Sequence, residues 1–145
     1  MTTRATWIAA LAAVALAVGS SGVALAGPTL THRGLGTYLL RVSVEPKTVP
    51  GHKGVLITAH GDSPPTDRVE LEVFATSFPF CQPQAAQEAE NPKASKVVIK
   101  EKVEGNFSRS VNYVAAARGE QRACAYLYKV PSLTLAHGYG SWKVM

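Results

Sequence analysis

The sequence predicts an all-β domain built as a two-sheet sandwich of about seven strands. Three observations support this: short runs in which apolar and polar residues alternate, Gly/Pro-rich turns between them, and a single stretch that suits a helix. Such patterning is typical of sandwiches rather than of helical or parallel-sheet folds. The strand we expect at the middle of a sheet is Gly119 to Tyr128, where a turn glycine leads into an aromatic-rich alternating run.

The first 26 residues have the three-part plan of a secretory signal peptide. A basic start at Arg4 precedes an apolar run from Trp7 to Val18, and Ala24-Leu25-Ala26 offers small residues for cleavage. The apolar run is shorter than the roughly 20 residues that a membrane span needs. We therefore predict export with cleavage after residue 26. An uncleaved N-terminal anchor is the alternative, and it is the one route by which we expect membrane contact.

The rest of the chain divides into a leader and one domain. Residues 27–37 are polar and glycine-rich, which predicts a flexible leader, and residues 38–145 suit a single domain. The formal net charge of the whole chain is +5. Lysines between positions 96 and 102 are interleaved with Glu101 and Glu104, as on a solvated strand edge. Because the charge is spread in this way, we expect no nucleic-acid partner.

The expected strands follow period-2 alternation and end at turn residues. In the first, Leu40 and Val42 alternate with polar residues, and Pro46 ends the strand because proline has no N–H to donate. In the third, an apolar face lies opposite Glu70 and Glu72, so that side is expected to face water. The expected strands are residues 38–45, 54–59, 68–76, 96–103, 107–113, 119–128 and 133–144.

Three connecting features carry predictions of their own. Pro83 to Glu90, in the loop after the third strand, suits one or two helical turns. Glu104-Gly105-Asn106 predicts a hairpin between the fourth and fifth strands. Gly138 and Gly140 are expected to interrupt the last strand.

Several of these segments resemble the small immunoglobulin-like domains that are common in secreted bacterial proteins. The segments concerned are Val44-Glu45-Pro46 with Pro50-Gly51, Gly105-Asn106-Phe107, and Gly119 leading to Cys124-Ala125-Tyr126-Leu127. The resemblance covers most of residues 38–144 and implies an immunoglobulin-like sandwich. The chain departs from antibody-type domains because its second strand has no cysteine and its third no tryptophan. The group is functionally mixed, so the resemblance implies no particular activity.

The chain has two cysteines, Cys81 and Cys124. An exported protein with two cysteines usually pairs them, so we predict a disulfide, with free or reactive thiols as the alternative. Closing a loop of this length stabilises the fold by about 4 kcal/mol in the chain-entropy treatment.

Which side of the central strand faces the core determines which segments the disulfide connects. Ala123, Ala125 and Leu127 form its more apolar set and are expected to face the core. Cys124 would then lie on the outer face, and the bond would hold the loop of residues 81–90 against the sheet. In the rival arrangement, Cys124 faces the core together with the tyrosines of the same strand.

A metal-binding sandwich, with copper or zinc, is one alternative function. Cys124, His137 and Met145 occur in the order of blue-copper ligands. The gaps between them are long, however, and a paired Cys124 offers no thiolate. The four histidines lie in separate segments without the i, i+4 spacing of a helical metal pair. We therefore predict no metal site and no cofactor.

A small secreted hydrolase is the second alternative, because His60-Gly61-Asp62-Ser63 contains the residue types of a catalytic triad. Neighbours on one turn do not form a triad, and the chain has no G-x-S-x-G motif. The leading prediction is that the protein is not an enzyme.

Aromatic residues gather on the last two expected strands, which should neighbour each other. They are Tyr126, Tyr128, Tyr139 and Trp142. Sharing an exposed face, they would form a binding surface for an extracellular protein or a carbohydrate; the alternative is packing inside the domain. The sequence thus predicts a secreted, non-enzymatic binding or structural module whose ligand it does not identify.

Overall fold

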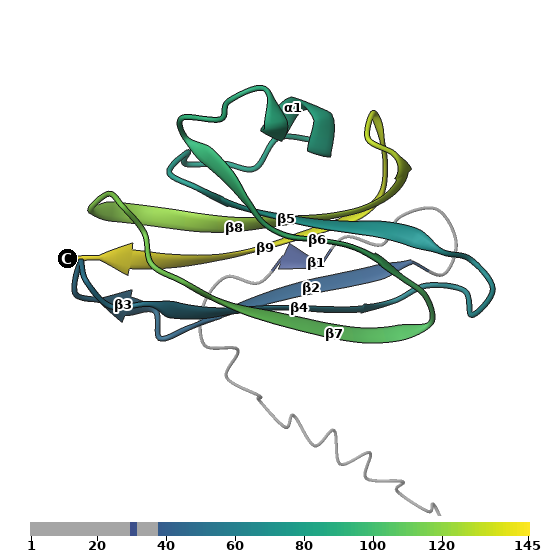
Figure 1. The fold of residues 1–145 in the computed structure, drawn as a ribbon, viewed down its shortest axis with the longest axis horizontal. Coiled ribbons are helices and arrows are strands. Elements are labelled where there is room, and N and C mark those ends of the chain that lie inside the picture. Colours follow the sequence, from purple (N-terminus) through teal and green to yellow (C-terminus); the bar gives the residue numbers. More distant parts are fainter. Residues whose placement is uncertain (1–29, 32–37) are drawn as a thin grey trace, which may run out of the picture.

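In this computed structural model, residues 30–31 and 38–145 are described, and they form a sandwich of two β-sheets with one short helix (Figure 1). The elements are β1 (Leu30–Thr31), β2 (Leu39–Glu45), β3 (Thr48–Val49), β4 (Val55–Asp62), β5 (Val69–Thr76), α1 (Ala85–Ala89), β6 (Ser95–Val103), β7 (Asn106–Tyr113), β8 (Gly119–Val130) and β9 (Leu133–Val144). The larger sheet has the order β1-β9-β8-β5-β6, with β3 paired to β9, and the smaller has the order β2-β4-β7. The predicted all-β, two-sheet fold is therefore confirmed, and β8 lies at the middle of its sheet.

The N-terminal predictions fall mostly outside the described residues. The expected signal peptide, residues 1–26, lies outside them, and so does the expected leader, residues 27–37, except for β1. The two residues of β1 pair antiparallel with β9, opposite Tyr139 and Gly138.

The main core fills the space between the two sheets. Every second residue of β2 and β4 is buried there, as the alternation predicts. From the larger sheet, Ala123, Ala125 and Leu127 of β8 face the same core without exposed surface. Burying a large apolar side chain stabilises a fold by about 1.5–3 kcal/mol, so this layer is the principal source of stability.

Three glycines that were expected to interrupt or end strands lie inside continuous strands instead. The predicted interruption at Gly138 and Gly140 is wrong, because β9 is continuous. A Cβ at Gly140 would lie 3.0 Å from Val44 Cγ2, so glycine lets β9 approach β2 of the opposite sheet. Gly61, expected in a turn, lies within β4; a Cβ there would collide with the Leu39 carbonyl oxygen.

The connection between β6 and β7 is not the predicted hairpin. β6 pairs with β5, whereas β7 pairs with β4, so the connection carries the chain from one sheet to the other. Gly105 has a φ of 60°, and its carbonyl oxygen accepts a hydrogen bond from the Ser63 N–H at 3.0 Å. Val103 and Phe107, on either side of this crossing, are both buried in the shared core.

The strand β6 forms one edge of the larger sheet, as its charges predicted. Its three lysines are exposed, and its pairing with β5 shifts register between Val73 and Phe74. Arg109 of β7 pairs with Glu101 of β6 at 2.7 Å, which bridges the edges of the two sheets. Edge lysines and a bulge hinder pairing with other chains.

The outer face of the larger sheet, which points away from the smaller sheet, is covered in part by residues 77–94. We call this segment, which contains α1, the disulfide loop (Figure 1). A second buried cluster beneath it contains Phe74, Cys124, Tyr126 and Tyr128. The expectation that Glu72 faces water is therefore wrong: Glu72 is only 5% exposed.

Candidate binding cleft beside the disulfide loop

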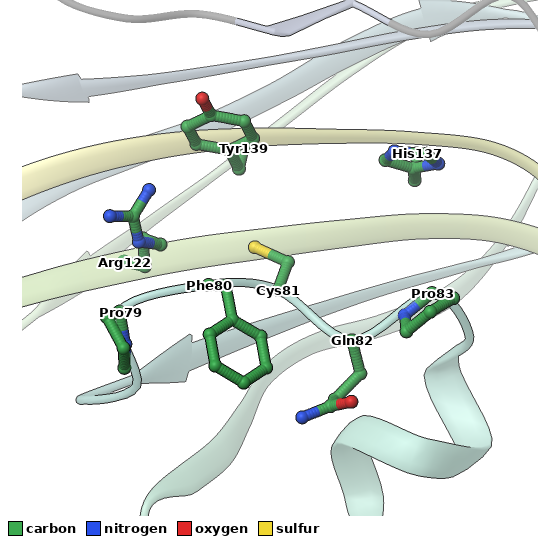
Figure 2. Close-up of a pocket in the computed structure, with 8 residues that line it drawn as sticks. All are labelled: Pro79, Phe80, Cys81, Gln82, Pro83, Arg122, His137 and Tyr139. Carbon is green, nitrogen blue, oxygen red and sulfur yellow. The ribbon is translucent and has the colours of Figure 1, made fainter.

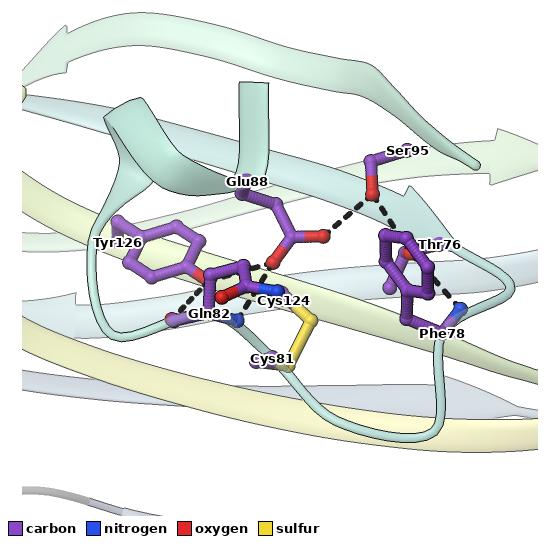
Figure 3. The surroundings of a disulfide bond; sticks show 8 residues. All are labelled: Thr76, Phe78, Cys81, Gln82, Glu88, Ser95, Cys124 and Tyr126. Carbon is purple, nitrogen blue, oxygen red and sulfur yellow. Dashed lines mark hydrogen bonds between the residues drawn. A yellow bond between two sulfur atoms is a disulfide. The ribbon is translucent and has the colours of Figure 1, made fainter. Parts of the chain in front are cut away.

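The predicted disulfide between Cys81 and Cys124 is present, with the two Cα atoms 5.7 Å apart. Cys124 is fully buried on the outer face of β8, and Cys81 is partly buried on the disulfide loop. Because Ala123 and Ala125 face the main core, the expected facing of β8 is confirmed. The bond therefore fastens the loop to the outside of the sandwich rather than joining the two sheets (Figure 3).

A buried carboxylate gives the loop a second attachment. Glu88 of α1 is fully buried. Its carboxylate accepts hydrogen bonds from the Ser95 hydroxyl at 2.5 Å, the Gln82 N–H at 2.8 Å and the Tyr126 hydroxyl at 3.1 Å (Figure 3). The Tyr126 hydroxyl also lies 2.6 Å from the Gln82 carbonyl oxygen. These partners offset the cost of burying a polar group, so the loop is held by specific bonds as well as by the disulfide.

Two tyrosine hydroxyls beneath the loop have strongly raised pKa values. Burial raises the pKa of Tyr126 far above its ordinary value, and the adjacent Glu88 carboxylate raises it further. Burial likewise raises the pKa of Tyr128, followed by its hydrogen bond to Glu72. Both hydroxyls therefore stay protonated to a more alkaline pH than exposed tyrosines, and both donate to the carboxylates beside them.

A cleft of about 460 Å³ lies where the disulfide loop meets the surface of β8 and β9 (Figure 2). One wall is formed by residues 79–83 of the loop. The other is formed by Arg122 of β8 and by His137 and Tyr139 of β9. Both walls are fixed, one by the two attachments of the loop and the other by the sheet itself.

Arg122 and Tyr139 form a preorganised pair in this cleft. The guanidinium carbon lies 5.3 Å from the centre of the Tyr139 ring. Such a cation–π contact restrains a guanidinium while leaving N–H donors available to other partners. None of the ion pairs found among the described residues uses Arg122.

The loop wall presents aromatic surface. Phe80 is 57% exposed, and its ring stacks on that of Phe78 with centroids 6.3 Å apart. An exposed large apolar side chain beside a cleft is typical of a binding surface. Sequence reasoning placed this segment outside a strand but did not select its rings; the available signal was two phenylalanines around Pro79 next to a cysteine.

The aromatic surface expected from the sequence does not form. Tyr126 and Tyr128 are buried beneath the disulfide loop. Trp142 is buried in the main core, where it contacts Tyr113 edge-on at 6.1 Å. Alternation along β9 places Trp142 and Tyr139 on opposite faces. Of the four residues, Tyr139 alone is partly exposed, and it is the member that lines the cleft.

The three residues of the metal-site alternative do not form one site. Cys124 is in the disulfide, His137 lines the cleft and Met145 follows the end of β9. Among residues 30–31 and 38–145, no group of three His, Cys, Asp or Glu side chains is placed to hold a metal ion.

The hydrolase alternative lacks an accessible nucleophile, because Ser63 is buried away from the exposed face that His60 and Asp62 share on β4. His60 and Asp62 are exposed on β4, whereas Ser63 is buried, with its hydroxyl 3.4 Å from the Asp67 carbonyl oxygen. A nucleophile, base and orienting acid must lie within hydrogen-bond reach of one another, which this arrangement does not provide.

Comparison with known proteins gives one structural likeness. No family model and no curated protein matches the chain. The chain is similar to the crystal structure of the PmoD soluble domain from Methylocystis sp. ATCC 49242 (Rockwell), with 14% sequence identity and a TM-score of 0.47 over 80% of this chain and 97% of that chain. In the part of the chain that the structure describes, no helix has the length and apolar character to cross a membrane.

Proposed function

We propose that the protein is a secreted, non-enzymatic binding module of immunoglobulin-like type whose ligand site is the cleft beside the disulfide loop. The observation that carries this proposal is a single cleft lined by exposed Phe80 of the disulfide loop and by Arg122, which makes a cation–π contact with Tyr139. Ligand sites commonly combine apolar walls with a few fixed polar groups in a concave setting. This cleft has that composition.

Two observations support an extracytoplasmic location. The first 26 residues have the plan of a signal peptide. The disulfide between Cys81 and Cys124 suits an oxidising compartment, because such bonds are rare where thiols are kept reduced.

The chemistry of the cleft supports binding rather than turnover. Cys81, the thiol-bearing residue in its wall, is held in the disulfide and is not a thiolate nucleophile. The remaining described lining groups supply stacking surface together with hydrogen-bond donors and acceptors.

A fragment screen by NMR tests the proposal. Oxidised ¹⁵N-labelled protein is titrated with a chemically mixed set of small aromatic acids, aromatic amides and monosaccharides. We expect the perturbed amide signals to cluster at residues 80–82, 122, 137 and 139, and to be lost in Phe80→Ala. Leu133→Ala is the matched control, because Leu133 is equally exposed but lies at the β8–β9 turn.

Two results would overturn the proposal. Perturbations confined to another surface would move the site. Robust ester, peptide or glycoside hydrolysis that is abolished by His60→Ala would instead support the hydrolase alternative.

A further inference from the structure

The charges and shapes within the cleft select a chemical class of ligand. Resting on the proposed function of the cleft, we infer that it binds a ligand carrying a carboxylate next to a flat apolar group. The carboxylate would pair with Arg122, and the apolar group would lie against Phe80.

The case for a carboxylate begins with the charge of the lining. Among the described residues that line the cleft, Arg122 is the permanently charged one, and none is Asp or Glu. Glu88 lies behind the loop wall, where its carboxylate is occupied by three hydrogen-bond donors, including the N–H of Gln82. An anion entering the cleft therefore meets a cation without a competing acidic side chain in this lining.

The geometry of Arg122 favours a planar anion. The guanidinium carbon lies 5.3 Å from the centre of the Tyr139 ring, and this cation–π contact restrains the guanidinium before a ligand arrives. A carboxylate can accept two parallel N–H···O bonds from the planar fork of a guanidinium, and these charge-assisted bonds are about twice as strong as neutral ones. Prior fixing reduces the side-chain entropy lost on binding.

The opposite wall explains why the anion should carry an apolar group. Phe80 exposes more than half of its side chain and is backed by the parallel ring of Phe78. Pro79 and Pro83, also in the lining, are apolar and rigid. A ring or other flat group would cover this surface, and its burial contributes about 25 cal/mol per Å² of apolar area.

The test uses four probes on oxidised ¹⁵N-labelled protein: phenylacetate, its neutral match phenylacetamide, acetate, and N-acetylphenylalanine as a peptide carboxyl terminus. We expect phenylacetate to bind at least about ten-fold more tightly than either phenylacetamide or acetate, because each lacks one of the two halves. Tighter binding of N-acetylphenylalanine than of phenylacetate would assign the carboxylate to a peptide terminus. The reverse order would assign it to small aromatic acids.

Variants separate the two walls. Arg122→Gln should remove the preference for phenylacetate over phenylacetamide, and Arg122→Lys should restore only part of it because lysine lacks the planar fork. Phe80→Ala should weaken phenylacetate and phenylacetamide alike. Arg41→Gln is the control, since Arg41 is an exposed arginine on the smaller sheet.

The outcomes distinguish this inference from the proposed function. Equal binding of phenylacetate and phenylacetamide at the cleft would overturn the carboxylate inference and leave the binding site in place. Absence of any probe from the cleft, together with binding elsewhere, would overturn both. A preference for phenylacetate that survives in Arg122→Gln would remove Arg122 from the inference.

Discussion

The two faces of β8 are both buried, but by different parts of the chain and by different chemistry. On the inner face, Ala123, Ala125 and Leu127 pack against the opposite sheet through apolar contacts alone. On the outer face, Cys124 and Tyr126 are covered by the disulfide loop, which is fastened by one covalent bond and by a buried carboxylate. The inner face therefore depends on many interchangeable contacts, and the outer face on a few specific ones.

The inner face of β8 thus serves the stability of the fold, and the outer face serves the proposed binding site. The sandwich needs the inner face, whereas the cleft needs the outer face, because residues 79–83 of the loop form one of its walls. Changes under the loop should deform the cleft while the sheets persist. Changes in the main core should destabilise both together.

Removing the disulfide should have the largest effect on the outer face. In the double variant Cys81→Ala/Cys124→Ala, we expect a loss of about 4 kcal/mol in the free energy of unfolding, from the regained chain entropy of the unfolded state. Chemical denaturation measures this loss, and far-UV circular dichroism should retain the β-sheet signal in water. Failure of the variant to form sheet at all would show that the loop is part of the folding core.

Leu127→Ala tests the inner face. The side chain is fully buried between the sheets, and its truncation should cost about 3 kcal/mol through lost transfer energy and the resulting cavity. The loss should lower the protection of the loop and of both sheets together. Leu133→Ala, at an exposed position, should change stability by less than about 0.5 kcal/mol.

Glu88→Gln tests the second attachment of the loop. The carboxylate receives three donors, and an amide would turn an N–H₂ group toward one of them. We expect a loss of about 2 kcal/mol, since a buried polar group is left unsatisfied. Glu90→Gln, at the exposed end of the same helix, is the control. Equal stability of the two variants would contradict the role given to the buried carboxylate.

Alkaline pH should lower the free energy of unfolding through the two tyrosines under the disulfide loop, by a smaller amount than the substitutions above. The pKa of Tyr126 and of Tyr128 is raised in the folded protein above the ordinary value of 10.0. Their protonated form is thus favoured by folding, so their contribution is complete below pH 10 and is lost as pH rises above it. Each should lower stability by up to about 1.4 kcal/mol per pH unit in that range. Denaturation from pH 9 to 11 should show this slope reduced in Tyr126→Phe and Tyr128→Phe.

Alternation was sufficient to predict most of the fold. It located the strands, placed Ala123 and Leu127 inward and set Cys124 outward, because a period of two reports the facing of a strand directly. It did not predict that β6 and β7 belong to different sheets. The connection at Gly105 has the same residues whether the next strand pairs with the last or crosses to the other sheet, and distant β4 decides between these.

The cleft was harder to predict from the sequence, because segments that are far apart along the chain come together to form it. Glu72 alternates like a solvated residue but is buried, with its carboxylate bonded to Tyr128 of β8 and Lys100 of β6 on the neighbouring strands. Tyr139 was identified among the aromatic residues, but its partners in the cleft, Arg122 and Phe80, come from segments 17 and 59 positions away along the chain. No local pattern connects them.

Hydrogen exchange on oxidised and reduced protein tests most directly the claim that the disulfide loop is a separate layer fastened to a self-sufficient sandwich. Intact mass establishes the redox state of Cys81 and Cys124, and exchange is then compared along the chain. We predict that reduction raises exchange first in residues 77–90, while Val55 to Ala59 and Val69 to Val73 keep their protection. A loss of protection in those strands equal to the loss in the loop would contradict the account and place the bond within the folding core.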